Sequence, residues 1–86
     1  MSQIESLIPG MGQPVVVRLE ASCAAVNRTL AEINLRGRTG ATVLTVVRGE
    51  QAILPGPGEK LAAGDVLTLT GTDEAITAAA AVLRLG

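Results

Sequence analysis

The stretch NRTLAEINLRGRTGATVLTVVR, residues 27–48, decides the fold of this chain. Thr29 and Glu32 have the spacing of a capping box, in which each side chain binds a free backbone N–H at the start of a helix. A short helix is therefore predicted from Thr29 to about Asn34, with Ile33 on its core side. The rest of the fold is built outward from this helix.

The second half of the same stretch predicts a break and then a strand. Gly37 and Gly40 are expected to interrupt the chain around Arg38 and Thr39. Residues 41–48 follow as a nearly continuous apolar run, which is typical of a strand buried on both faces.

Four more segments complete the pattern. Strands are predicted at residues 14–20, 51–54 and 66–70, with β-branched residues marking the first and apolar–polar alternation the last. A helix is predicted at residues 72–85, because Thr72 is a good N-cap. The buried stripe of that helix is expected to be Ile76, Ala80 and Leu83. The order β-α-β-β-β-α predicts a small α+β domain, with a helix packed on an antiparallel or mixed sheet.

Composition narrows the function. The chain has 86 residues, 48% of them hydrophobic and none of them aromatic, so its thin aliphatic core favours association with a second copy. A net charge of −1 without a basic cluster argues against nucleic-acid binding.

The inventory of reactive side chains is equally short. The chain has no His and its single Cys is Cys23, so no metal site and no catalytic set is expected, and the protein is predicted not to be an enzyme. No run of about 18 apolar residues is present, which argues against direct membrane insertion. A reducing cytoplasm fits the lone cysteine.

Four pieces together resemble the RCK C-terminal (TrkA-C) domain family: residues 27–36, 39–44, 61–67 and Gly71-Thr72 before the last helix. The resemblance covers Val17 to Ala80. It implies an RCK-C-like domain over residues 14–86, with residues 1–13 as a linker or the tail of an upstream helix. It also implies a cytoplasmic regulator of bacterial potassium or cation flux, attached to the inner face of the membrane through a transporter or antiporter subunit.

The resemblance further implies a homodimer, and for some members a cyclic di-AMP ligand between the two protomers. The positions that resemble such a site are Ile33, Asn34, Leu35, Arg36, Arg38 and Thr42. Arginines suit phosphate oxygens, and an asparagine amide suits a base or ribose.

Two alternatives stay open from the residues alone. Arg36 and Arg38 could be solvated loop cations, paired with Glu32 or Glu20. The domain could also be a purely structural dimerisation module that pairs through residues 41–48 and binds no small molecule.

Overall fold

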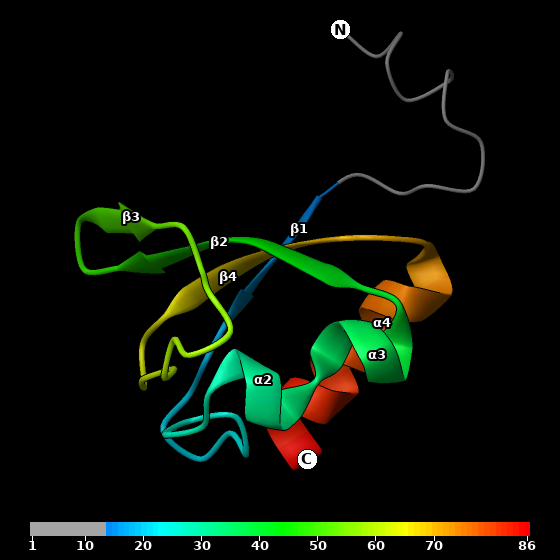
Figure 1. Cartoon of the computed structure of the whole chain (residues 1–86), viewed down its shortest axis with the longest axis horizontal. Helices are drawn as coiled ribbons and strands as arrows, with labels where there is room; N and C mark the ends of the chain where they lie inside the picture. Colours follow the sequence, from blue (N-terminus) through cyan, green and yellow to red (C-terminus); the bar gives the residue numbers. More distant parts are fainter. Residues whose placement is uncertain (1–13) are drawn as a thin grey trace, which may run out of the picture.

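The computed structural model describes residues 14–86, so the predicted linker at residues 1–13 lies outside the described residues. In chain order (Figure 1) the elements are β1 (Val15–Arg18), α2 (Leu30–Ile33), α3 (Leu35–Thr39), β2 (Thr42–Arg48), β3 (Gln51–Ile53), β4 (Val66–Thr70) and α4 (Asp73–Leu85). The predicted α+β class is confirmed.

The four strands form one antiparallel sheet in the order β1-β4-β2-β3. Leu67 in the central strand β4 lies opposite Val17 on one side and Val46 on the other, and all three side chains are buried. In Figure 1 the three helices lie on one side of this sheet. The predicted packing of helix on sheet is therefore confirmed, and the sheet is antiparallel, not mixed.

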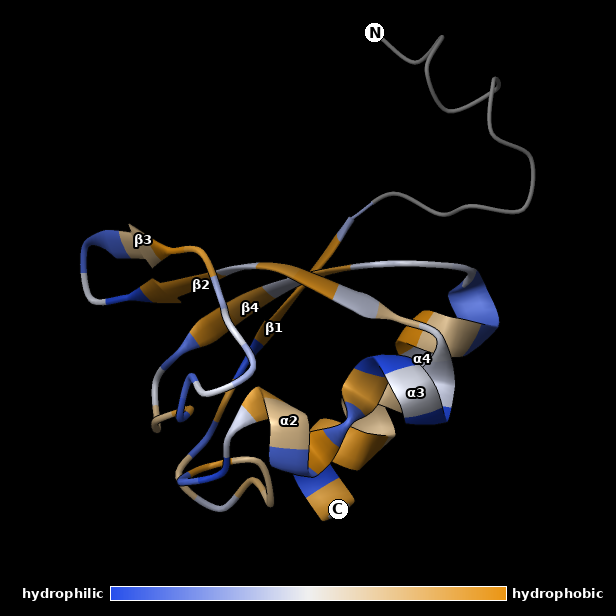
Figure 2. Ribbon diagram, in the orientation of Figure 1, coloured by the Kyte–Doolittle hydropathy of each residue, from blue (hydrophilic) through white to orange (hydrophobic). Residues whose placement is uncertain are grey.

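The core is aliphatic and lies between the sheet and the helices. Figure 2 shows hydrophobic residues along the strands and in the helices that pack on them. The largest fully buried apolar side chains are Leu19, Val46, Leu61, Leu67, Leu69 and Leu83. This core leaves the other face of the sheet without a covering layer among residues 14–86.

The both-faces burial predicted for residues 41–48 is therefore wrong. Within β2 itself Val46 is buried, Leu44 is 43% exposed and the remaining residues are half-buried. The helices cover one face of the strand, and its other face stays open along the described chain. The apolar run at residues 41–48 thus belongs to a strand that is covered on one face and has exposed aliphatic side chains such as Leu44 on the other.

The chain after α2 differs from the prediction. Gly37 does not interrupt the chain, because it lies inside a second short helix, α3. The interruption is at Asn34, whose φ of 52° separates the two helices, and α3 ends at Gly40 with a φ of 86°. A Cβ atom on Gly37 would come 2.5 to 2.9 Å from side-chain atoms of Asn34, so glycine serves here for close approach.

The buried stripe of α4 is also rotated from the prediction. Leu83 is buried as expected, but the other buried positions are Ala75 and Ala79, while Ile76 and Ala80 are half-buried. Alanines on this face let the helix lie close to its neighbours, and a Cβ built on Gly71 would already meet that of Ala75 at 3.3 Å. Within residues 14–86, no helix has both the length and the apolar character to cross a membrane.

Candidate functional site

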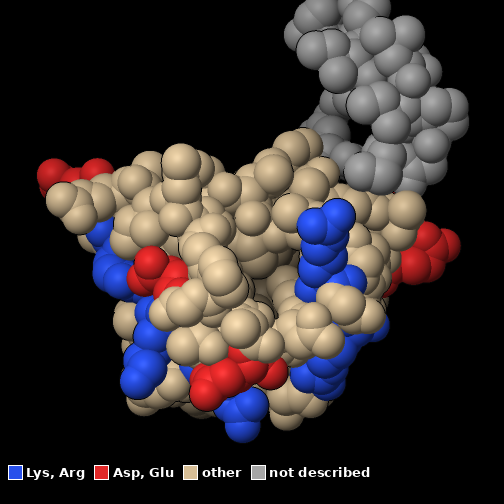
Figure 3. Space-filling view, viewed as in Figure 1, with Lys and Arg blue, Asp and Glu red and all other residues tan. Residues whose placement is uncertain are grey.

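Four of the six predicted site residues meet at one hollow. Asn34, Leu35, Arg36 and Thr42 line an open hollow of about 340 Å³, which we call the α2–β2 hollow. Its opposite wall is the loop at residues 55–57, and its remaining lining is aliphatic. The hollow is visible near the middle of Figure 3, where a basic side chain stands beside it.

The local structure fixes this hollow. Thr29 and Glu32 form the predicted capping box, with the Thr29 N–H donating to Glu32 Oε1 at 2.9 Å and the Glu32 N–H to Thr29 Oγ1 at 3.1 Å. The backbone hydrogen bond from Thr29 lowers the pKa of Glu32, which keeps the cap charged. The Ala31 N–H donates to the carbonyl oxygen of Pro57 at 2.9 Å, so the loop wall is tied to α2.

The polar groups of the α2–β2 hollow suit an anionic ligand. Arg36 is exposed, and no carboxylate of residues 14–86 lies within ion-pair distance of it. Asn34 adds an amide and Thr42, at the first position of β2, adds a half-buried hydroxyl. A free guanidinium beside hydrogen-bonding groups and aliphatic walls is the chemistry of a site for a phosphate with an apolar body.

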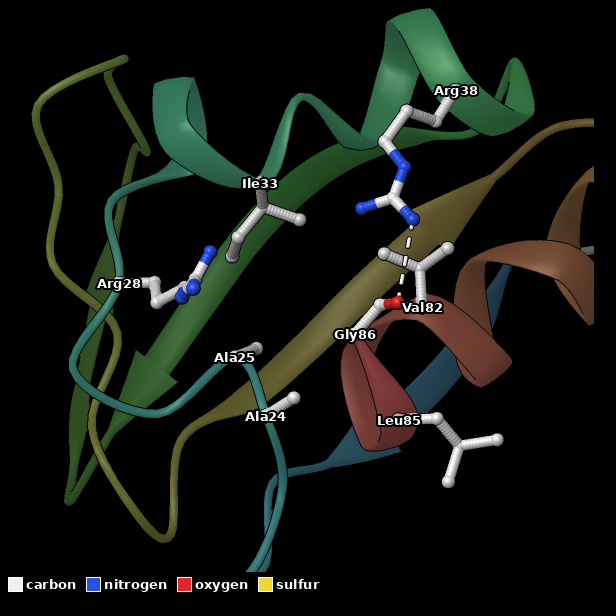
Figure 4. Close-up of a pocket in the computed structure, with 8 residues that line it drawn as sticks. All are labelled: Ala24, Ala25, Arg28, Ile33, Arg38, Val82, Leu85 and Gly86. Atoms are coloured by element: carbon white, nitrogen blue, oxygen red, sulfur yellow. Dashed lines mark hydrogen bonds between the residues drawn. The ribbon is translucent and has the colours of Figure 1, made fainter.

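The other two predicted residues do not join this set. Ile33 and Arg38 line a second hollow of about 400 Å³, the α3–α4 hollow, together with Arg28, Val82 and residues around them. Figure 4 shows Arg28 and Arg38 on opposite sides of it, with Ile33 between them. Ile33 is buried, and Arg38 Nη2 donates to the carbonyl oxygen of Gly86 at 3.4 Å. The six residues are thus divided between two hollows.

Arg36 and Arg38 are exposed, as the alternative of solvated cations expects, but they lie in α3 and not in a loop, and neither pairs with Glu32 or Glu20 in the described chain. Glu20 pairs with Arg18 at 3.4 Å, and Glu32 caps α2. Neither carboxylate therefore neutralises Arg36 or Arg38.

No sequence pattern indicated that the loop at residues 55–57 would form a wall of the α2–β2 hollow. The loop at residues 55–58 reads as a plain turn, and its role appears only through long-range contacts. Thr29 forms a β-bridge with Lys60, and the Leu30 N–H donates to the carbonyl oxygen of Glu59 at 3.2 Å. No local pattern predicts that this loop returns to the start of α2.

A second feature missed from the sequence is an ion cluster around a buried carboxylate. Asp65 is 1% exposed and accepts from Arg48 through Nε at 2.9 Å and Nη2 at 2.8 Å, and from the Ala62 N–H at 2.9 Å. Arg48 also donates to the Lys60 carbonyl oxygen at 3.0 Å and to Glu59 at 3.3 Å. These bonds tie the end of β2 to the turn before β4.

The charges of Arg48 and Asp65 are paired with each other. The hydrogen bonds from Arg48 hold the pKa of Asp65 below its ordinary value against the opposing effect of burial, and the same pairing raises the pKa of Arg48. Both carboxylate oxygens of Asp65 accept hydrogen bonds, so this cluster is an anchor of the fold. No group of three or more metal-ligating side chains occurs within residues 14–86.

The comparisons with known proteins test the family resemblance and the fold. A family model described as the TrkA-C domain matches residues 15–84. No curated protein matches the chain. The resemblance predicted from the sequence is confirmed by the family model.

Solved structures share the fold. The RCK_C domain dimer of BusR from S. agalactiae, in complex with c-di-AMP, superposes with a TM-score of 0.75 at 20% identity, covering 85% of this chain and 97% of that one. The RCK C domain of the potassium transport protein KtrA, also in complex with c-di-AMP, gives 0.68 at 23% identity, covering 79% and 81%.

Longer proteins contain the same unit. The GsuK channel bound to NAD matches with a TM-score of 0.71 at 27% identity, covering 95% of this chain and 15% of that one. BusR in complex with its busAB-promotor DNA matches at 0.69 and 26% identity, covering 85% and 37%. This chain therefore spans a small part of the channel and about a third of the DNA-bound protein.

Proposed function

The chain belongs to the TrkA-C domain family, and from this premise we propose that it is a regulatory, ligand-sensing domain of a bacterial potassium or cation transport system. Its partners in this role are a second copy and a membrane transporter or antiporter subunit, which holds it at the cytoplasmic face of the membrane. The role is regulatory and not catalytic. Neither DNA nor RNA is a partner in this proposal.

The ligand we propose is cyclic di-AMP, bound between two protomers at their α2–β2 hollows. The observation that carries this proposal is the meeting of Asn34, Leu35, Arg36 and Thr42 at one hollow with an unpaired guanidinium. Two RCK_C domains of the same fold have been solved in complex with c-di-AMP.

The symmetry of the ligand supports a shared site. Cyclic di-AMP consists of two identical nucleotides, and a two-fold dimer presents the same surface twice. One hollow of about 340 Å³ is at the lower end of the size of small-molecule sites, so a single protomer would cover half of the ligand. Binding that favours one arrangement of the two protomers would then pass to the transporter as a change of conformation.

The test is calorimetry with cyclic di-AMP on the 86-residue chain and on two variants. We expect saturable binding by the wild type and a Kd raised at least about tenfold in Arg36→Ala, since a charge-assisted hydrogen bond is lost. Arg18→Ala is the matched control, because Arg18 is an exposed arginine engaged with Glu20 and absent from the hollow. No heat at millimolar ligand would refute the nucleotide form of this proposal.

The second candidate function is a structural dimerisation module. The observation in its favour is the open aliphatic face of the sheet, where Val16 is 62% and Leu44 is 43% exposed. Sedimentation velocity distinguishes the two functions. A dimer whose dissociation is unchanged by cyclic di-AMP supports the structural module, and a dimer strengthened by the nucleotide supports the sensor.

A further inference from the structure

The α3–α4 hollow has an unusual charge for this protein. The chain carries a net charge of −1, yet this hollow is lined by two arginines, Arg28 and Arg38, and by no Asp or Glu side chain among the described residues. Gly86, the last residue of the 86-residue chain, also lines the hollow, and its terminal oxygen accepts from Arg38 Nη2 at 3.4 Å. Neither arginine pairs with an Asp or Glu side chain within residues 14–86. Glu32 interacts with the charge of Arg28, but its carboxylate is committed to the Thr29 N–H at 2.9 Å.

The walls that carry these arginines are fixed by the backbone. The N–H groups of Ala24 and Ala25 donate to the carbonyl oxygens of Arg84 and Leu83 at 3.0 and 3.1 Å, so the loop before α2 is tied to the end of α4. The backbone of Arg28 is held on both sides, since its N–H donates to Ala25 and its carbonyl oxygen accepts from Leu61. The hollow therefore exists before any ligand arrives.

The two cations stand on separate elements. Arg28 belongs to this loop and Arg38 to α3, and Figure 4 shows both side chains directed at the space over Ile33, Ala25 and Val82. Ala25 and Ile33 are buried and form an apolar floor. A molecule with an anionic group and a small apolar body would contact both arginines and this floor together, and its anionic group would replace the Gly86 oxygen as the partner of Arg38.

We propose that the α3–α4 hollow is a second ligand site, separate from the α2–β2 hollow, that binds a small phosphate-bearing molecule between Arg28 and Arg38. A phosphate monoester carries a charge near −2 at neutral pH and has three acceptor oxygens, which matches two guanidinium groups in charge and in donors. The volume of the α3–α4 hollow, about 400 Å³, is at the lower end for small-molecule sites, which favours a sugar phosphate over a dinucleotide as its ligand.

The test is a titration of the ¹⁵N-labelled 86-residue chain with ribose 5-phosphate at constant ionic strength, followed by amide chemical shifts. We expect saturable shifts at Ala24, Ala25 and Gly86, which border the hollow. In Arg28→Gln, and separately in Arg38→Gln, the Kd should rise at least about tenfold. Both side chains are exposed, and the spectrum of each variant reports directly that the fold is kept.

Three controls decide the outcome. Arg84→Gln removes the same charge from an exposed arginine that does not line the hollow, and it should bind as the wild type does. Ribose should cause no shift, and malonate should bind at least about tenfold more weakly than the phosphate. Shifts that are absent, that persist unchanged in Arg28→Gln, or that malonate reproduces at equal affinity would overturn the proposal.

The second site is also separable from the proposed cyclic di-AMP site. Arg36→Ala should leave the affinity for ribose 5-phosphate unchanged, because Arg36 lines the other hollow. Arg28→Gln should leave the calorimetric affinity for cyclic di-AMP unchanged for the same reason. Loss of both activities in both variants would show a single anion surface and would refute two sites.

Discussion

Two regions of this molecule use arginine in opposite ways. At the end of β2, Arg48 donates to Asp65, Glu59 and a backbone carbonyl oxygen, and the Asp65 carboxylate it holds is 1% exposed. At the α3–α4 hollow, Arg28 and Arg38 have no Asp or Glu partner among the described residues, and Arg38 makes one long hydrogen bond, of 3.4 Å, to Gly86. The guanidinium of Arg48 is bonded to groups of the protein itself, and those of Arg28 and Arg38 are exposed to solvent.

This difference assigns Arg48 to the stability of the fold, and Arg28 and Arg38 to the binding of a ligand. A guanidinium that satisfies a buried carboxylate cannot leave it without a large cost, so Arg48 is a part of the fold. Exposed arginines without partners contribute little to folding and are free to bind anions. The three predictions below test this division, beginning with the largest expected effect.

Arg48→Met should destabilise the domain most. It leaves Asp65 buried without a counter-charge, which we expect to lower the free energy of unfolding by about 3 kcal/mol, the lower end for a broken buried pair. The lower end applies because the Arg48 side chain is 39% exposed and the Ala62 N–H remains bonded to Asp65. Urea denaturation measures this loss.

Arg18→Met is the matched control for that experiment. Its pair with Glu20 has side chains 64% and 67% exposed, so the same substitution should change stability by at most about 0.5 kcal/mol. Equal effects of the two substitutions would refute the anchoring role of Arg48.

The pH dependence of stability should follow Asp65 with a smaller amplitude. Because the folded pKa of Asp65 is lowered from 3.8, its contribution is complete above that value and is lost as the pH falls through the folded pKa. The loss should be smaller than that of Arg48→Met, since a neutral carboxyl still accepts hydrogen bonds from its neighbours. Thermal unfolding between pH 7 and pH 2 tests this, and Asp65→Asn should flatten the acid limb.

Arg28→Gln and Arg38→Gln should have the smallest effect on stability. Neither residue pairs with an Asp or Glu side chain within residues 14–86, so each change should stay within about 0.5 kcal/mol. Removing the Arg28 charge reduces its repulsion with Arg38 and favours a slight gain in stability, whereas Arg38→Gln also removes the hydrogen bond to Gly86. A loss comparable with that of Arg48→Met would place these arginines in the fold and not at a ligand site.

The sequence predicted what depends on local pattern. The capping box at Thr29 and Glu32, the N-cap at Thr72 and the start of β2 near Thr42 are signals carried by a few adjacent residues, and the structure contains all three. The α+β class followed from the same signals. Of the buried stripe predicted for α4 only Leu83 was correct, because several adjacent alanines leave the helical period of the apolar residues ambiguous.

The missed features depend on contacts between distant segments. Gly37 serves close packing inside α3, and a glycine that serves packing has the same letter as one that breaks a helix. Asp65 resembled an ordinary turn residue because its partner, Arg48, lies on another strand. The division of the predicted arginines between two hollows follows from α3, which the sequence analysis did not predict: Arg36 and Arg38 are two positions apart on this helix, about 200° around its axis, and so face different hollows.

The edge position of β1 has a consequence for how the domain is made. Val17 pairs with Leu67, and the Ala24 N–H donates to the carbonyl oxygen of Arg84. The N-terminal part of the domain therefore forms these contacts only after the C-terminal part has been synthesised. Loop closure over such separations slows folding. A ribosome must therefore release almost the entire domain before its first strand gains a neighbour, and a nascent chain halted before Leu67 would expose β1 to chaperones.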